Sequence, residues 1–150
     1  MTELDPYRLL NSIAGPEDLQ RLDDGQLQAL AEQMRARIAE VVSSNGGHLA
    51  SNLGVCEMTI ALHMVFDFKW DRLLFDVGHQ CYPHKLITGR GARFDTLRQA
   101  GGISGFPAPS ESEYDVFATG HAGTAISTAV GLAKAADLAG REQALAREAA

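Results

Sequence analysis

Three of the five histidines in this chain follow a glycine directly: His48, His79 and His121. Glycine lets the backbone approach a ligand closely, and imidazole can donate a hydrogen bond to phosphate or exchange a proton near neutral pH. A single histidine in a turn more often has a structural role, but three in the same context shift the balance toward a functional one. The pattern therefore predicts anion binding or proton transfer at these turns. His63 differs, because it lies among apolar residues of a predicted helix, and we expect it to be packed or partly exposed there.

The last of these turns, Gly120-His121-Ala122-Gly123, opens a predicted helix. The first turn of a helix has free backbone amides and the positive end of the helix dipole, which together favour phosphate. The turn matches neither the GxGxxG dinucleotide fingerprint nor the GxxxxGK(S/T) phosphate loop. By itself it therefore allows an anion site and identifies no particular ligand.

The acidic residues give a weaker signal. Glu111, Glu113 and Asp115 alternate where a loop leads into a predicted strand, and carboxylates in such places are usually solvated. We therefore expect no catalytic role for them. Asp76 stands inside an apolar segment, where a charged side chain needs a hydrogen-bonding partner, so we expect a structural role for it.

The N-terminal half of the chain has the pattern of two helices. From Asp24 to Asn45-Gly46-Gly47, apolar residues recur every three or four positions, which predicts an amphipathic helix closed by glycine. A second helix is predicted from about Leu53 to Phe66. Residues 101–110 are rich in glycine, proline and serine, and so long a loop is usually a lid, a binding loop or disordered.

The C-terminal half has the pattern of strands followed by helices. Short apolar runs at Leu73–Val77 and Tyr114–Ala118 predict buried parallel strands, and an alanine-rich helix is predicted from about Thr124 to Leu138. Strands that alternate with helices predict an α/β layered domain with a parallel sheet. Ligands of such domains bind beyond the carboxyl ends of the strands, where the turns of His79 and His121 lie.

The composition is that of a globular protein and argues against several classes. The chain has 150 residues, 45% hydrophobic and 21% charged, which is enough for one domain or for a piece of a larger one. A formal net charge of −6 with no basic run argues against a nucleic-acid partner. The sequence has no apolar run long enough to predict a membrane span or a secretory leader. Cys56 and Cys81 lack CxxC spacing, which favours free thiols, and we expect a cytoplasmic protein.

Three longer motifs stand in a fixed order along the chain. They are Gly46-Gly47-His48-Leu49-Ala50-Ser51-Asn52-Leu53-Gly54, then Asp76-Val77-Gly78-His79-Gln80 with Tyr82-Pro83-His84-Lys85, and then Ser110-Glu111-Ser112-Glu113-Tyr114-Asp115-Val116. Together they resemble the 1-deoxy-D-xylulose-5-phosphate synthase family of transketolase-like thiamine-diphosphate enzymes. The resemblance runs from about Tyr7 to Gly140 and covers only the first part of that much longer enzyme.

The resemblance implies a thiamine-diphosphate- and Mg²⁺-dependent transferase. Such an enzyme condenses pyruvate with glyceraldehyde 3-phosphate, releases carbon dioxide and forms 1-deoxy-D-xylulose 5-phosphate for isoprenoid, thiamine and pyridoxal phosphate synthesis. The resemblance also implies that residues 1–150 are the N-terminal part of an α/β diphosphate-binding domain, and that the full-length protein is a homodimer. His79 and the Gly120-His121-Ala122 turn match cofactor-contacting positions, and His48 matches an active-site histidine near the substrate.

Two departures from the family's pattern bear on these expectations. Ala122 and Gly123 stand where the family usually has serines, so hydroxyl contacts are missing although backbone amides remain. The family's metal-binding Gly-Asp-Gly, and the asparagine beyond it, do not occur in these 150 residues. Asp23-Asp24-Gly25 is no substitute, because it precedes a helix near the N-terminus. We therefore assign no metal ligand here, and we expect this chain by itself to be inactive.

Two alternatives stay open beside the synthase reading. One is a non-catalytic protein, either a truncated remnant or a small binding module that keeps the scaffold without the chemistry. A parallel sheet of only two strands with open edges would be an unfavourable complete fold. This pattern therefore favours a truncated chain. The other alternative is a transketolase relative, which would use sugar acceptors and would not decarboxylate pyruvate.

Overall fold

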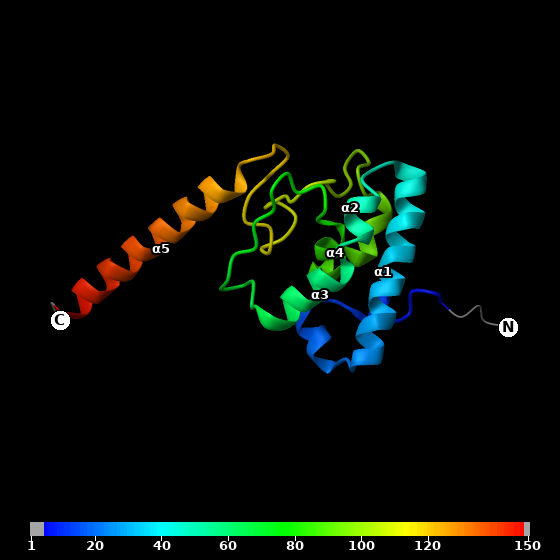
Figure 1. Cartoon of the computed structure of the whole chain (residues 1–150), viewed down its shortest axis with the longest axis horizontal. Helices are drawn as coiled ribbons and strands as arrows, with labels where there is room; N and C mark the ends of the chain where they lie inside the picture. The colour runs from blue at the N-terminus through cyan, green and yellow to red at the C-terminus, as the bar shows by residue number, and fades with distance from the viewer. Residues whose placement is uncertain (1–4, 149–150) are drawn as a thin grey trace.

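The structure is a computed structural model that describes residues 5–148, and within that range it is built from helices (Figure 1). In chain order these are η1 (Leu10–Ser12), η2 (Pro16–Arg21), α1 (Asp24–Asn45), α2 (Ala50–Leu53), α3 (Cys56–Val65), α4 (Tyr82–Lys85), η3 (Leu86–Arg90), η4 (Gly91–Thr96) and α5 (Ala125–Glu148). The short elements η1, η2 and η4 are 3₁₀ helices, and η3 is a π-helical turn. Figure 1 shows one body formed by the elements before α5, from which α5 extends as a rod.

The helix α1 follows the predicted period closely. It begins with a capping box, in which the Asp23 carboxylate accepts from the Gln26 amide at 2.8 Å and the Gln26 side chain accepts from the Asp23 amide at 3.0 Å. It ends at Gly46, whose φ of 75° is a left-handed conformation that favours glycine. The predicted apolar face is buried, and its buried members are Leu30, Ala31, Met34, Ile38 and Val41. The predicted helix is thus confirmed.

The core forms where α1 packs against α3, and where α3 packs against α4. Its largest side chain is that of Tyr82, which is fully buried. One prediction needs correction here, because the helix expected from about Leu53 to Phe66 is divided into α2 and α3. The division falls at Gly54, and glycine is a poor residue for a helix interior.

The two predicted strands do not form, since no segment of residues 5–148 is a β-strand. A strand exists only where its backbone pairs with another segment, and Leu73–Val77 and Tyr114–Ala118 do not pair with each other. The backbone hydrogen bonds at their ends are local turns instead, such as the Gly78 amide to the Asp76 carbonyl at 2.8 Å. The predicted parallel sheet is therefore not observed, and the described architecture is helical.

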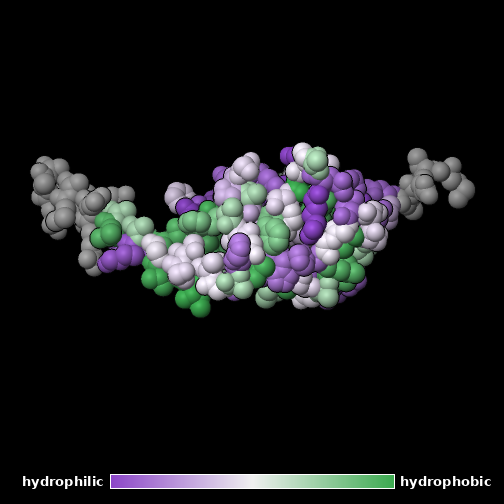
Figure 2. All heavy atoms as spheres, turned by 90° about the horizontal axis from the view of Figure 1, so that it is seen from above, coloured by the Kyte–Doolittle hydropathy of each residue, from purple (hydrophilic) through white to green (hydrophobic). Residues whose placement is uncertain are grey.

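The C-terminal helix α5 is longer than the predicted helix from Thr124 to Leu138 and leaves apolar residues exposed. Ile126 and Val130 are 80% and 64% exposed, and Figure 2 shows hydrophobic side chains at the surface near the start of this helix. Within residues 5–148, none of the helices combines the length and the apolar character needed to cross a membrane.

Candidate functional site

His48 follows a pair of glycines that closes α1. Gly47 has a φ of 146°, and a Cβ added there would lie 2.8 Å from the Tyr82 hydroxyl oxygen, so a side chain would not fit. This close approach lets the His48 amide donate to the Tyr82 hydroxyl at 3.3 Å. The His48 ring lies edge-on to the His79 ring, with 5.1 Å between the ring centroids. The structure therefore brings two of the predicted site histidines together.

The protonation of His48 is set by its surroundings. Partial desolvation, followed by the nearby His79 and Arg98, lowers the pKa of His48. The neutral imidazole is therefore favoured at neutral pH, where it has one nitrogen that accepts and one that donates. Such a ring can take up a proton from a bound molecule and return it.

His79 is placed by Gly78, which the fold packs too tightly for a side chain. Gly78 has a φ of 84°, and a Cβ there would collide with the Thr119 hydroxyl and lie 2.5 Å from Cδ of Pro107. The His79 turn therefore lies against the segment that leads into Gly120. Nδ1 of His79 and Oγ1 of Thr119 are both buried without a hydrogen-bond partner. Buried polar atoms normally have partners, so each of these two has the capacity to form a hydrogen bond with a polar group placed beside it.

Asp76 connects the His79 turn to the start of α5. Its Oδ1 accepts hydrogen bonds from the amides of Gly123 at 2.8 Å and Thr124 at 3.1 Å. This confirms the expectation that Asp76 needs a partner and has a structural role. It also limits the predicted anion site, because the Gly123 and Thr124 amides already donate to the Asp76 carboxylate and are not available to an anion.

A hollow of about 440 Å³ lies beside the predicted site residues. Gly120 and His121 line it, together with Thr119, while Ala122 is exposed and is not among its lining residues. Phe106 from the long loop also lines the hollow, and its ring centroid lies 6.0 Å from that of His48. The His48 and His79 pair and the Gly120-His121 turn thus belong to one region, joined through Phe106 and Thr119.

One residue of this region was given no role from the sequence. Asn52 in α2 is fully buried, and its side-chain amide donates to the carbonyl oxygens of His48 at 2.7 Å and His79 at 2.8 Å. Its Oδ1 accepts from the Tyr82 amide at 2.9 Å. The local sequence gives no signal for this role, because all three partners are backbone groups and two of them are distant in the chain.

The expectation that the acidic residues are solvated is wrong for two of the three. Asp115 is buried, and its carboxylate lies 2.6 Å from Nη1 of Arg90 and 3.0 Å from Nε2 of His84. Glu111 is mostly buried and pairs with the fully buried Lys85 at 2.6 Å. Burial raises the pKa of Asp115, but hydrogen bonds from His84 and Arg90 outweigh it and hold that pKa well below its usual range. Glu113 is exposed, as predicted.

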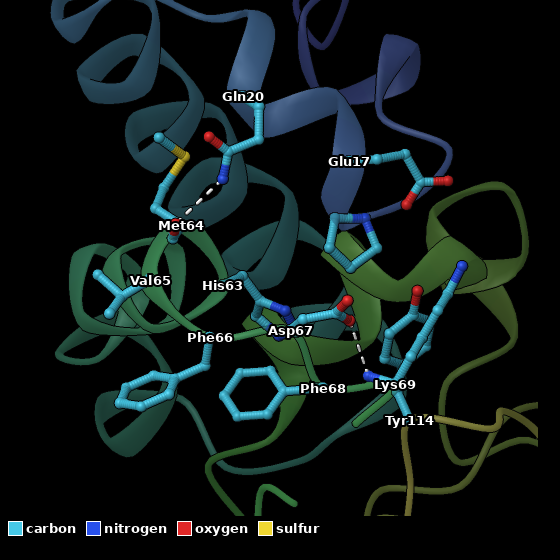
Figure 3. A pocket seen from close by; sticks show the side chains of 11 residues that line it. Glu17, Gln20, His63, Met64, Val65, Phe66, Asp67, Phe68, Lys69 and Tyr114 are labelled. Atoms are coloured by element: carbon cyan, nitrogen blue, oxygen red, sulfur yellow. Dashed lines mark hydrogen bonds between the residues drawn. The ribbon is translucent and has the colours of Figure 1, made fainter. Parts of the chain in front are cut away.

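His63 lies in a different place, at a second hollow of about 480 Å³ between η2, the end of α3 and Tyr114 (Figure 3). It is 3% exposed, which confirms that it is packed, and its Nε2 lies 3.0 Å from Nδ1 of His84. Burial lowers the pKa of His63 to about 3. None of the three glycine–histidine turns lines this hollow.

Other features bear on cofactor and compartment. Cys56 and Cys81 are free and buried, which confirms the prediction of free thiols. Within the part of the chain that the structure describes, no group of three or more histidine, cysteine or acidic side chains is placed to hold a metal ion.

Comparison with known proteins agrees with the motifs. A family model described as 1-deoxy-D-xylulose-5-phosphate synthase matches residues 10–147. The chain is 58% identical over 137 residues to the protein of that name from Cupriavidus metallidurans, covering 91% of this chain and 22% of the relative. Proteins of the same name from Dictyoglomus thermophilum and Treponema pallidum (strain Nichols) are 58% and 60% identical, over 89% and 85% of this chain. The chain thus spans about a fifth of the length of these relatives, of which it covers 20% to 22%. The match over most of its residues places the chain in the 1-deoxy-D-xylulose-5-phosphate synthase family.

Proposed function

We propose that this chain supplies part of the cofactor and substrate site of a 1-deoxy-D-xylulose-5-phosphate synthase. That enzyme condenses pyruvate with glyceraldehyde 3-phosphate and releases carbon dioxide, as the first step of the non-mevalonate isoprenoid route. The observation that carries the proposal is the contact of the His48 and His79 rings, 5.1 Å apart, beside the hollow lined by Gly120 and His121. Membership of the family supports it further.

Thr119 lines the hollow and the His79 turn packs against Thr119, so polar groups in and beside the hollow fit thiamine diphosphate. Nδ1 of His79 and Oγ1 of Thr119 are buried and unpaired, so each can form a hydrogen bond with a polar ligand group. We assign cofactor binding to His79 and to the turn Gly120-His121-Ala122, whose backbone amides suit a diphosphate. Thiamine diphosphate, when bound, supplies the carbanion chemistry of the reaction.

His48 is proposed as the catalytic residue near the substrate. Its lowered pKa favours the neutral ring at neutral pH, which can accept a proton from a substrate and later donate it. Phe106, beside His48, provides an apolar wall that helps to exclude water from the hollow. Mg²⁺ would need ligands outside the described residues, since no suitable group occurs among them.

The architecture of the whole enzyme is part of the proposal. We propose that residues 1–150 are the N-terminal part of an α/β diphosphate-binding domain, and that Leu73–Val77 and Tyr114–Ala118 become strands of its parallel sheet. The exposed end of the second segment supports this, because Phe117 is 44% exposed although it belongs to an apolar run. A homodimer and a cytoplasmic location complete the proposal, and the two free, buried thiols agree with a reducing compartment.

A chimera tests whether this segment provides a working part of a synthase. Residues 10–147 would replace the matching segment of the Cupriavidus metallidurans synthase, with the unaltered synthase as control. We expect the chimera to bind thiamine diphosphate and to form 1-deoxy-D-xylulose 5-phosphate with release of carbon dioxide. A folded chimera that binds no cofactor would favour the non-catalytic alternative. Turnover of sugar acceptors without decarboxylation of pyruvate would favour a transketolase relative.

A further inference from the structure

Asn52 is the only side chain in the described range that hydrogen-bonds to the backbone of both His48 and His79. Its orientation is unambiguous, because the two carbonyl oxygens can only accept and the Tyr82 amide can only donate. The side-chain nitrogen therefore faces the two histidine carbonyls, and the side-chain oxygen faces Tyr82. One buried group joins the loop after α1, the turn before α4 and the first residue of α4.

The partner of this contact on the core side is rigidly placed. Tyr82 is fully buried, and its ring packs edge-on against that of Phe94, with 6.2 Å between the centroids. Its hydroxyl also accepts from the His48 amide, which is a second connection to the same loop. Tyr82 is thus fixed in the core and holds Asn52 in place, and Asn52 in turn holds the backbone of both histidines.

We propose that Asn52 is the positioning residue of this site, which holds the His48 and His79 rings in contact through the backbone that carries them. Asparagine suits this position because its short side chain supplies two donors and one acceptor from a single planar group. Aspartate has no donor for the two carbonyls, and leucine has the volume without any hydrogen bond. The hydrogen bonds of Asn52 reach the backbone of the two histidines and not their ring nitrogens, so its role is to position them.

The placement can be measured without any cofactor. The groups that face His48 are His79, Arg98 and Phe106, and the contact with them accompanies a lowered pKa of His48. In the purified chain, the five histidine rings can be followed by NMR during a pH titration. We expect Asn52→Leu to move the His48 pKa upward toward its ordinary value, because the released loop is better solvated and lies farther from His79 and Arg98. Leucine adds no charge, so a change cannot come from a new carboxylate.

A matched variant separates positioning from a general loss of stability. Gln20 in η2 also donates its side-chain amide to a backbone carbonyl, that of Met64 at 3.0 Å, and it contacts neither histidine. Gln20→Leu should therefore leave the His48 pKa unchanged. If Asn52→Leu does not fold, Asn52→Ser keeps one hydroxyl donor and should give a smaller upward shift. A folded Asn52 variant with the wild-type His48 pKa would overturn the proposal.

The catalytic consequence rests on the proposed function and is measured in the chimera. A displaced reacting group can cost about a hundredfold in rate, so Asn52→Leu should lower kcat by about that factor while Gln20→Leu leaves it unchanged. An inactive parent chimera would contradict the proposed function alone, since the NMR titration still decides the role of Asn52. An active chimera in which Asn52→Leu keeps full kcat would contradict the positioning role.

Discussion

At the scale of single residues, the chain uses its histidines in two different ways. His48 and His79 lie beside a hollow, whereas His63 and His84 are buried in a polar network that ends at Asp115. Because a carboxylate can only accept, Nε2 of His84 carries the proton that it donates to Asp115. For neutral rings, Nδ1 of His84 then accepts from Nε2 of His63. The buried pair is thereby fixed in one proton arrangement and serves the fold.

The two histidines of the site should respond differently to removal. In the chimera, we expect His79→Ala to raise the concentration of thiamine diphosphate needed for half-saturation, because an unpaired cofactor-facing group is lost. We expect His48→Ala to lower kcat by about a hundredfold to ten-thousandfold, the usual cost of a lost proton-transfer group. Steady-state kinetics at several cofactor concentrations separate the two effects. An unchanged kcat for His48→Ala would contradict the catalytic role of His48 and favour a structural one.

His63 should make the stability of the chain depend on pH. Its pKa in the folded state, about 3, lies below its value in the unfolded chain, so unfolding takes up a proton at mildly acidic pH. The contribution of His63 to the free energy of unfolding is fully present above about pH 6.5, and it is lost progressively as the pH falls below that value. Urea unfolding at about pH 7.5 and about pH 5 measures the loss, and His63→Phe should reduce it. Equal pH dependence in wild type and variant would assign the loss to other groups.

The residues missed from the sequence share one cause. Asp115 and Glu111 were expected to be solvated because they alternate where a loop leads into a predicted strand, but their partners Arg90 and Lys85 lie 25 and 26 positions earlier. Asn52 was missed for the same reason, because His79 and Tyr82 reach it only through the fold. The glycine–histidine pairs could be predicted because the close packing at Gly47 and Gly78 leaves no room for a side chain. Only glycine fits there, and a glycine before a histidine can be recognised in the sequence.

At the scale of elements, helices were predictable and strands were not. The helix α1 satisfies its own backbone hydrogen bonds, so its period and its capping residues identify it locally. The segments Leu73–Val77 and Tyr114–Ala118 have the composition of strands, but a strand also needs a partner segment at the right place. Within residues 5–148 neither segment has one, and an apolar run cannot indicate that in advance.

The start of α5 should depend on a residue far from it in the sequence. Asp76→Ala removes the carboxylate that accepts from the Gly123 and Thr124 amides, 47 and 48 positions away. A hydrogen bond typically contributes about 0.5–1.5 kcal/mol to stability, so the turn that leads into α5 should open more often without this carboxylate. Hydrogen exchange should become faster at these two amides and stay unchanged within α1. The control Asp24→Ala removes a carboxylate that contacts neither amide and should leave both exchange rates unaltered.

At the scale of the whole molecule, several large apolar side chains lie exposed on the described surface. Val65, Trp70 and Ile126 are 76%, 84% and 80% exposed, and the last lies on the rod of α5 (Figure 1). Large apolar side chains exposed to this degree favour contact with another chain or domain. We therefore expect the purified 150-residue chain to self-associate reversibly, with an average mass in analytical ultracentrifugation that rises with concentration.

A pair of neighbouring substitutions on α5 tests the source of that association. Ile126→Glu replaces an exposed apolar side chain by a charged one and should weaken association. Ser127→Glu adds the same charge one position along the helix, where the wild-type side chain is exposed and polar, and should weaken it less. Equal effects of the two variants would show that charge repulsion, and not apolar contact, controls the association. A wild-type chain that stays monomeric at all concentrations and melts in one sharp transition would contradict the expectation, because its exposed apolar residues would then cause no contact between copies.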